Sequence, residues 1–210
     1  MPATNKYNMT YNSAIASKNH CRNYLPHIED KQCQFITFRL YDSLPQSVID
    51  YYRATLIYLK NKDITSDVYE KKTKECLSII AKYEDSGYGQ CFFRDERIAE
   101  LMANTLHYHN NTLYQLLEWC IMPNHIHVMI NMNKDSTLSQ ILHAWRSFTA
   151  SKGNEILGRK GKFWMNEYFD RYIRDYEHGV RVSSYIKMNP VKAGLVSKPE
   201  DWRWSSIWKG

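Results

Sequence analysis

The chain has 210 residues and a formal net charge of +6 at pH 7. This length suits one well-buried core, and no apolar run approaches the roughly 20 residues that span a bilayer. We therefore expect a soluble cytoplasmic protein with no membrane partner. Five cysteines without a Cys-x-x-Cys pair favour reduced thiols over a zinc-cysteine cluster.

The positive charge is concentrated in the last third of the chain. Residues 145–210 hold 13 Lys and Arg against 7 Asp and Glu, whereas residues 1–144 hold 15 of each class. Aromatic residues are interleaved with these basic residues, as in proteins that neutralise phosphates and stack on bases. The last third is therefore expected to face a polyanion, although a solvated basic surface over an aromatic core has the same composition.

The first half of the chain predicts an arm, a strand and a helical insertion. Residues 1–24 are polar and without periodicity, which predicts a flexible N-terminal arm, and residues 25–210 are expected to form one domain. Residues 33–40 are β-branched and aromatic, as in a strand. Helical spacing over residues 45–62 and 67–84 then predicts an insertion at about 46–90.

The second half completes an α+β pattern. The predicted elements are a helix capped by Asp95, strands over 113–121 and 125–132, a helix from Leu138, a loop over 152–162, an extended segment over 163–173, and a helix over 177–189 that ends before Pro190. Without the insertion, the order is strand, helix, strand, strand, helix, strand and a final helix. This order predicts a ferredoxin-like split βαβ fold with a central antiparallel sheet.

Two histidines one residue apart stand out in the segment Met122-Pro123-Asn124-His125-Ile126-His127-Val128. Alternate residues of a strand share a face, so His125 and His127 become neighbouring imidazoles that can bind one cation. Glu118, in the strand before them, is expected to face either solvent or the surroundings of that cation.

The last predicted helix contains a second chemical pair. Tyr185 and Asn189 are four residues apart and therefore share a helix face. If this face lies over His125 and His127, two imidazoles and the Asn189 oxygen can hold a cation beside the tyrosine hydroxyl. Such a mixed nitrogen and oxygen site suits Mg²⁺ or Mn²⁺.

Together these motifs resemble the single-tyrosine HUH transposases, specifically the REP-associated tyrosine transposases of the IS200-like group. The most specific part is a histidine pair followed about 60 residues later by Tyr185-Ile186-Lys187-Met188-Asn189-Pro190-Val191-Lys192-Ala193-Gly194-Leu195-Val196. The other segments that carry the resemblance are Phe35–Leu40 with Asp42–Pro45, Phe163-Trp164, Tyr168–Arg171 and Ile173–Asp175.

The resemblance implies a site and a reaction. His125, His127 and Asn189 would hold the divalent metal on a central strand and the C-terminal helix, and Tyr185 would be the nucleophile. The substrate would be single-stranded DNA carrying a REP-like hairpin, cleaved and rejoined through a 5′-phosphotyrosine without a nucleotide cofactor. Residues expected to contact DNA are Arg146, Lys162, Arg171, Arg174, Lys187 and Lys192.

Two alternative functions remain open. A domesticated protein would bind DNA hairpins without cutting them, and a metal hydrolase would use water in place of Tyr185 on a small phosphoester. The basic last third and the tyrosine helix favour the transposase. The sequence leaves open a monomer or a homodimer, and association with the nucleoid would follow from DNA binding.

Overall fold

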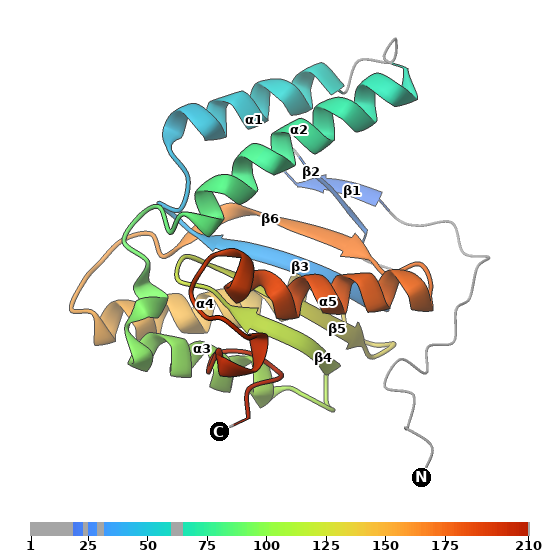
Figure 1. The fold of residues 1–210 in the computed structure, drawn as a ribbon. Helices are drawn as coiled ribbons and strands as arrows, with labels where there is room; N and C mark the ends of the chain where they lie inside the picture. The colour runs from blue at the N-terminus through green and yellow to red at the C-terminus, as the bar shows by residue number, and fades with distance from the viewer. Residues whose placement is uncertain (1–18, 23–24, 29–31, 60–64, 210) are drawn as a thin grey trace.

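The structure of the protein is a computed structural model, which describes residues 19–22, 25–28, 32–59 and 65–209. Figure 1 shows the arrangement of the elements. The strands are β1 (Asn19–Arg22), β2 (Leu25–Ile28), β3 (Cys33–Leu40), β4 (Tyr114–Ile121), β5 (His125–Met132) and β6 (Trp164–Tyr172). The helices are α1 (Gln46–Leu59), α2 (Ser66–Asp85), α3 (Glu96–Tyr108), α4 (Leu138–Ile156) and α5 (Tyr176–Lys192), with 3₁₀ turns η1 (Phe92–Arg94) and η2 (Pro199–Asp201).

The central sheet has four antiparallel strands in the order β4-β5-β3-β6. Chain order β3-α3-β4-β5-α4-β6 on this sheet is the split βαβ arrangement, which confirms the predicted ferredoxin-like α+β fold. The histidine-bearing strand β5 is central, between β4 and β3. Strand β5 therefore has a neighbour on each side, and its residues 125–130 are all buried.

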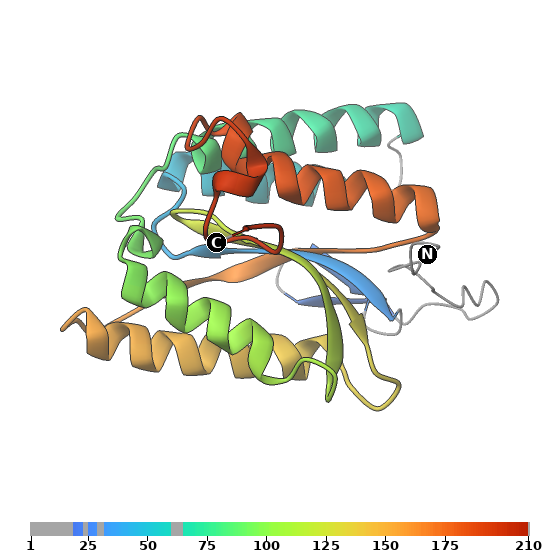
Figure 2. The same ribbon diagram turned by 60° about the horizontal axis from the view of Figure 1, so that its bottom comes forward.

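Helices α3 and α4 cover one face of the sheet, as Figure 2 shows. The main hydrophobic core lies between these helices and the alternate β5 residues Ile126, Val128 and Ile130. Asp95 caps α3 as predicted, because its side chain accepts from the amide of Arg97. This face is a packed scaffold for β5.

The opposite face carries α5 together with the insertion formed by α1 and α2, above the sheet in Figure 2. A second core cluster joins Met129 of β5 to Val182 and Ile186 of α5. A third cluster, Leu44, Val48, Cys76 and Ile80, holds α1 and α2 together. The predicted insertion after the first strand is therefore present, and it stands beside α5 over the same side of the sheet.

Three segments differ from their predictions: the N-terminal arm, the loop after α4 and the end of α5. Residues 19–22 of the predicted arm form β1, which pairs with β2, whereas residues 1–18 lie outside the described residues. The loop expected from residue 152 begins only at Leu157, because α4 continues to Ile156.

Helix α5 continues through Pro190 to Lys192, although we predicted its end at Asn189. The turn that follows is stabilised by hydrogen bonds from the amides of Ala193 to the carbonyl of Asn189 and of Leu195 to the carbonyl of Pro190. Gly194 has φ +67°, the left-handed conformation that commonly ends a helix. The C-terminal turn thus keeps Asn189 inside the helix.

No helix among the described residues is both long enough and apolar enough to cross a membrane.

Candidate metal centre and nucleophile

The two predicted histidines converge on one point. His125 and His127 project from the α5 side of β5, and their Nε2 atoms are 3.0 Å apart. In the β3–β5 register, Arg39 lies opposite His125 and Thr37 lies opposite His127. Both imidazoles are buried, and the pair forms the floor of a site between the sheet and α5.

Hydrogen bonds on the far side of each ring fix the imidazoles. His125 Nδ1 lies 2.8 Å from Asn124 Oδ1, and His127 Nδ1 lies 2.8 Å from Thr37 Oγ1. The Asn124 amide is oriented because its Nδ2 donates to the carbonyl of Tyr88. Since an amide oxygen only accepts, His125 carries its hydrogen on Nδ1 and turns a lone pair on Nε2 toward His127.

Burial keeps both imidazoles neutral. It lowers the pKa of His125 to about 3, with a further contribution from the positive charge of Arg39. Burial and the neighbouring His125 also lower the pKa of His127 well below its ordinary value. A neutral imidazole is the form that binds a metal ion.

Tyr185 and Asn189 lie over this pair, as the helical spacing predicted. The rings of Tyr185 and His127 have centroids 5.2 Å apart, and Phe35 of β3 packs edge-on against Tyr185 at 5.9 Å. Asn189 is buried one turn further along α5, where its side chain hydrogen-bonds with both Tyr185 and His127. Its Nδ2 also donates to the carbonyl of Tyr185.

The environment of Tyr185 opposes ionisation. Burial raises the pKa of Tyr185 to about 12, and Glu84 adds to this effect, whereas the hydrogen bond with Asn189 lowers it. The ammonium of Lys192 lies 4.9 Å from the centre of the Tyr185 ring. A positive charge at the imidazole pair would oppose the rise in pKa.

The donor atoms fit a small divalent cation. In the described part of the chain, no His, Cys, Asp or Glu adds a third member to a metal-binding group with these histidines. Asn189, buried on α5, can supply an amide oxygen, and its role as a metal ligand stays a prediction. Two imidazole nitrogens and one amide oxygen leave positions open for other ligands, unlike the closed sulfur-rich sites of structural zinc.

An ion pair that joins β3 to the insertion borders the site. Arg39 of β3 pairs with Glu84 near the end of α2, and both side chains are largely buried. The negative charge of Glu84 raises the pKa of Tyr185 and of His127. The sequence does not reveal this pair, because nothing in the helical periodicity of α2 indicates which turn reaches the sheet.

Glu118 anchors the tyrosine helix, so the structure shows neither role that we considered for it. Its carboxylate is fully buried and accepts from Ser183 Oγ of α5 at 3.1 Å and Ser206 Oγ at 2.6 Å. Lys187 Nζ lies 3.1 Å from the same carboxylate. These contacts fix α5 against β4 in the position that brings Tyr185 over the imidazoles.

The six residues predicted to contact DNA are not gathered on one surface. Arg146 hydrogen-bonds the backbone carbonyls of Met165 and Asn166, and Lys187 is held by Glu118. Lys162 and Lys192 are exposed near the insertion and Tyr185 respectively.

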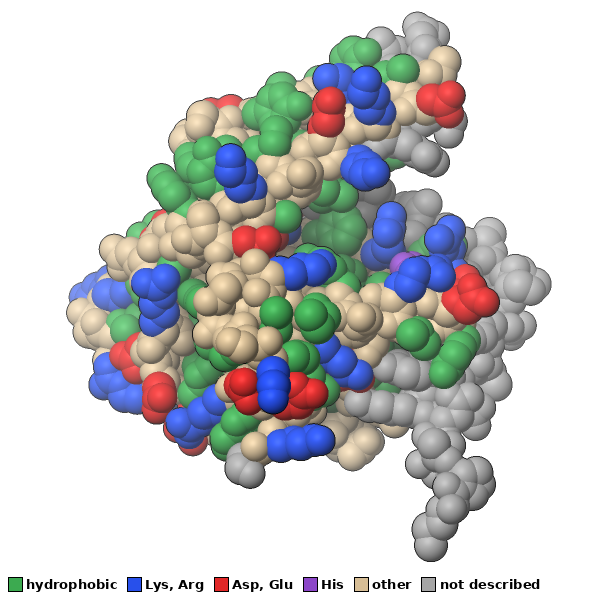
Figure 3. Space-filling view, viewed as in Figure 1, with side chains coloured by type: hydrophobic (Ala, Val, Ile, Leu, Met, Phe, Trp, Pro, Cys, Tyr) green, Lys and Arg blue, Asp and Glu red, His purple; other side chains and the backbone are tan. Residues whose placement is uncertain are grey.

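Arg171 and Arg174 are exposed where β6 ends and α5 begins, in a region where Figure 3 shows Lys and Arg side chains gathering. This region and the Tyr185 site occupy the same side of the sheet.

Comparison with known proteins agrees with the motifs. The family model described as "Transposase IS200 like" matches residues 88–189, which include both histidines, Tyr185 and Asn189. A protein from Haemophilus influenzae, named as a REP-associated tyrosine transposase, is 28% identical over 104 residues. The REP-associated tyrosine transposase of Escherichia coli K12 is 30% identical over 96 residues.

These sequence matches cover 45% of this chain and 59% and 54% of the two relatives. The chain thus aligns with little more than half the length of each relative. A solved structure of a REP-associated tyrosine transposase bound to a REP hairpin aligns over 92% of both chains, with a TM-score of 0.52 and 16% identity. At this identity the structural match establishes the fold.

The predicted resemblance to the REP-associated tyrosine transposases is confirmed by the family model and the two relatives, and the solved structure shares the fold of this chain.

Proposed function

We propose that this protein cleaves and rejoins single-stranded DNA that carries a hairpin, with Tyr185 as the nucleophile. The observation that carries the proposal is the 5.2 Å approach of the Tyr185 ring to His127, with Asn189 on the next turn of the same helix. A metal hydrolase that used water would not require a phenol at this position. The naming of relatives as REP-associated tyrosine transposases supports a REP-like hairpin as the substrate.

His125, His127 and Asn189 would hold Mg²⁺ or Mn²⁺. When bound, such a cation supplies positive charge that stabilises a phosphodiester under attack and favours an ionised phenol. Thr37 and Asn124 would orient the imidazoles by accepting from their Nδ1 hydrogens, as residues around metal ligands commonly do.

In the cleavage step, the Tyr185 oxygen forms a bond to phosphorus and the bond from phosphorus to the 3′ oxygen breaks. Tyr185 loses its proton and the departing 3′ oxygen gains one, so the DNA 5′ end becomes joined to the protein. Attack by a 3′ hydroxyl on this phosphotyrosine reverses the step and joins DNA ends. Because the bond energy is retained, no nucleotide cofactor is consumed.

The basic residues of the last third would hold the DNA backbone. Arg171, at the end of β6, and Arg174, just before α5, are exposed on the same side of the sheet as Tyr185. Contacts of this kind position the strand without reading its sequence.

The proposal is tested with hairpin oligonucleotides labelled on either side of the cleavage position. After incubation with Mn²⁺, we expect the label on the 5′-phosphate side to migrate with the protein on a denaturing gel. EDTA and Tyr185→Phe should both abolish this band. Tyr176→Phe, which alters an exposed tyrosine on the same helix, should retain it, and hairpin binding without any adduct would instead support a binding protein.

A further inference from the structure

Helix α2 of the insertion brings one buried charge to the proposed site. Cys76, Ile80 and Glu84 follow one another at four-residue intervals, so they share one face of α2. Cys76 and Ile80 pack in the third core cluster, and Glu84 is the next residue of this packed face. Its side chain is 5% exposed and pairs with Arg39 of β3. The docking of α2 therefore fixes the position of a buried carboxylate.

Arg39 lies where the pairing of β3 is interrupted. On one side it faces His125 in the β3–β5 register. On the other side the three residues 165–167 of β6 stand opposite Arg39 alone, which forms a bulge. Bulges of this kind redirect side chains and are common next to active sites. Arg39 thus lies at the border between the imidazole pair and the insertion.

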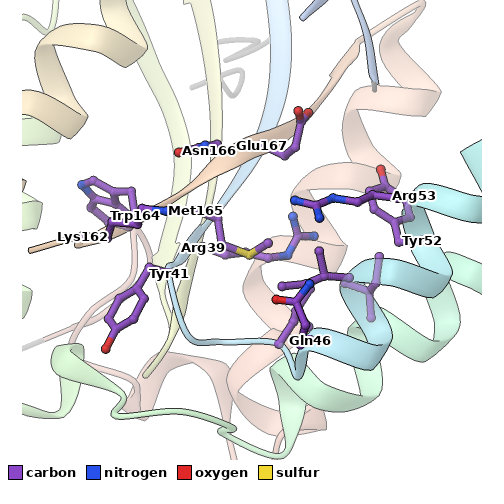
Figure 4. Close-up of a pocket in the computed structure, with 13 residues that line it drawn as sticks. Arg39, Tyr41, Gln46, Tyr52, Arg53, Lys162, Trp164, Met165, Asn166 and Glu167 are labelled. Carbon is purple, nitrogen blue, oxygen red and sulfur yellow. The ribbon is translucent and has the colours of Figure 1, made fainter. Parts of the chain in front are cut away.

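The pairing with Glu84 leaves the end of the Arg39 side chain available. Arg39 donates to Glu84 from Nε, whereas Nη1 and Nη2 have no acceptor among the residues that the structure describes. These two nitrogens carry four N–H donors in one plane, a geometry that matches two oxygens of a phosphate. Figure 4 shows the Arg53 side chain entering the same space from α1. An anion there would offset the repulsion between the two guanidinium groups.

The charge of Arg39 also acts on the groups that would carry out the reaction. Burial is the main reason for the low pKa of His125, and the charge of Arg39 is the second. Burial and Glu84 raise the pKa of Tyr185, and Arg39 opposes this rise. Because such effects decline with distance, the guanidinium lies near both side chains. An anion bound by Arg39 would therefore lie near the nucleophile.

Stability does not account for this ion pair. Apolar residues of similar volume often hold a structure as well as a buried ion pair does, because they avoid the cost of removing charges from water. The third core cluster already joins α1 and α2 through apolar contacts. The particular effect of Glu84 is to fix the direction of the Arg39 guanidinium.

We infer that Arg39 binds the phosphate that Tyr185 attacks, and that Glu84 positions the Arg39 guanidinium for this contact. Nη1 and Nη2 would donate to the non-bridging oxygens while Nε stays with Glu84, and no bond forms or breaks on either residue. Fixed donors of this kind stabilise negative charge that develops during attack. The inference rests on the proposed cleavage reaction and gives the insertion a part in it.

Single-turnover adduct formation with saturating hairpin DNA and Mn²⁺ tests this role. Arg39→Lys keeps the charge without the planar pair of donors and should slow the reaction about 100-fold. Glu84→Ala should slow it about 10- to 100-fold, and Glu84→Gln, which keeps an acceptor for Nε, should retain more of the rate. Glu75→Ala, at an exposed glutamate of the same helix, should leave the rate unchanged.

A double variant separates positioning from folding. If Glu84 acts only through Arg39, then Arg39→Ala combined with Glu84→Ala should be no slower than Arg39→Ala alone. The double variant leaves neither charge buried without its partner, and urea unfolding checks that it folds. Losses of rate that multiply in the double variant, or an unchanged rate in Glu84→Ala, would overturn the inference.

Hairpin binding in EDTA gives a second readout, without cleavage. The probe carries a methylphosphonate, which replaces one charged oxygen by a methyl group, at the phosphate where the adduct forms. At one fixed salt concentration, this change should weaken binding to the unaltered protein about tenfold and have little effect on the double variant. An equal loss in both proteins would overturn the contact between Arg39 and this phosphate.

The same measurements distinguish this inference from the proposed function. Adducts that form equally fast in the unaltered protein and in Glu84→Ala would leave cleavage intact and eliminate the positioning role. The absence of adducts with the unaltered protein would overturn the proposed function, and this inference with it.

Discussion

Thr37 and His127 are cross-strand partners whose side chains meet, with 2.8 Å between Thr37 Oγ1 and His127 Nδ1. Because His125 presents a lone pair on Nε2, His127 Nε2–H donates to it over 3.0 Å, and Thr37 donates to His127 Nδ1. When His127 Nε2 binds a cation, its hydrogen must move to Nδ1 and the Thr37 oxygen becomes the acceptor. Because a hydroxyl can donate or accept, Thr37 holds the His127 ring in place in both tautomers, including the one that binds a metal.

Thr37→Val removes this hydroxyl while keeping the side-chain shape. We expect Mn²⁺ affinity to fall about 10- to 100-fold, as for other residues that support metal ligands. Isothermal titration calorimetry measures the effect. Thr105→Val is the matched control, because the Thr105 hydroxyl bonds within α3 on the other face of the sheet, and equal losses in the two variants would contradict this role.

Asn189 is predicted to be the third ligand. Asn189→Ala should weaken Mn²⁺ binding and raise the metal concentration needed for adduct formation, whereas Asn189→Asp should preserve binding because it retains an oxygen at the same place. His125→Ala should have a larger effect than Asn189→Ala. Unchanged Mn²⁺ affinity in Asn189→Ala would remove this residue from the metal site.

The buried histidines predict acid sensitivity of the metal-free protein. The pKa of His125 is about 3 in the folded state and about 6.5 in an unfolded chain, so between these values the unfolded state binds more protons. Stability therefore falls as the pH drops through this window. At pH 5 this histidine alone should cost about 2 kcal/mol relative to pH 7.

Urea unfolding in EDTA at pH 7 and pH 5 measures this dependence. The difference between the two pH values should shrink in His125→Asn, which removes one titrating group. If the variant and the unaltered protein lose the same stability, the acid sensitivity arises elsewhere.

Glu118 is expected to position the catalytic helix. Glu118→Gln keeps the side-chain size but weakens the contacts to Ser183, Ser206 and Lys187, and should lower the free energy of unfolding by about 1–3 kcal/mol. Amide hydrogen exchange in α5 should accelerate. Glu177→Gln, at an exposed glutamate on the same helix, should change neither quantity, so matching effects in both variants would argue against an anchor.

Sequence periodicity predicted which site residues share a face within a single strand or a single helix. Strand alternation placed His125 and His127 on one face, and helical spacing placed Tyr185 with Asn189. Residues that join elements were harder to predict. Thr37 and Asn124 occur in the motifs that carry the resemblance, but their contacts depend on strand register and on the turn at Tyr88.

The insertion shows why the remaining contacts could not be predicted. The periodicity of α2 indicates a helix, but the pairing of Glu84 with Arg39 depends on how that helix docks on the sheet. The β6 bulge at residues 165–167 likewise has no Gly or Pro to mark it. We predicted the end of α5 at Asn189 because a proline disfavours helical geometry in the residue before it. The hydrogen bonds of the following turn stabilise that geometry, and the helix continues to Lys192.

Peptide mapping of the covalent complex tests the central claim most directly. After incubation with hairpin DNA and Mn²⁺, nuclease trimming and trypsin digestion, mass spectrometry should find the nucleotide on the peptide between Arg181 and Lys187, at Tyr185. A nucleotide on another tyrosine would contradict the assignment of the nucleophile. Cleaved DNA with no modified peptide would show that water, and not Tyr185, attacks the phosphodiester.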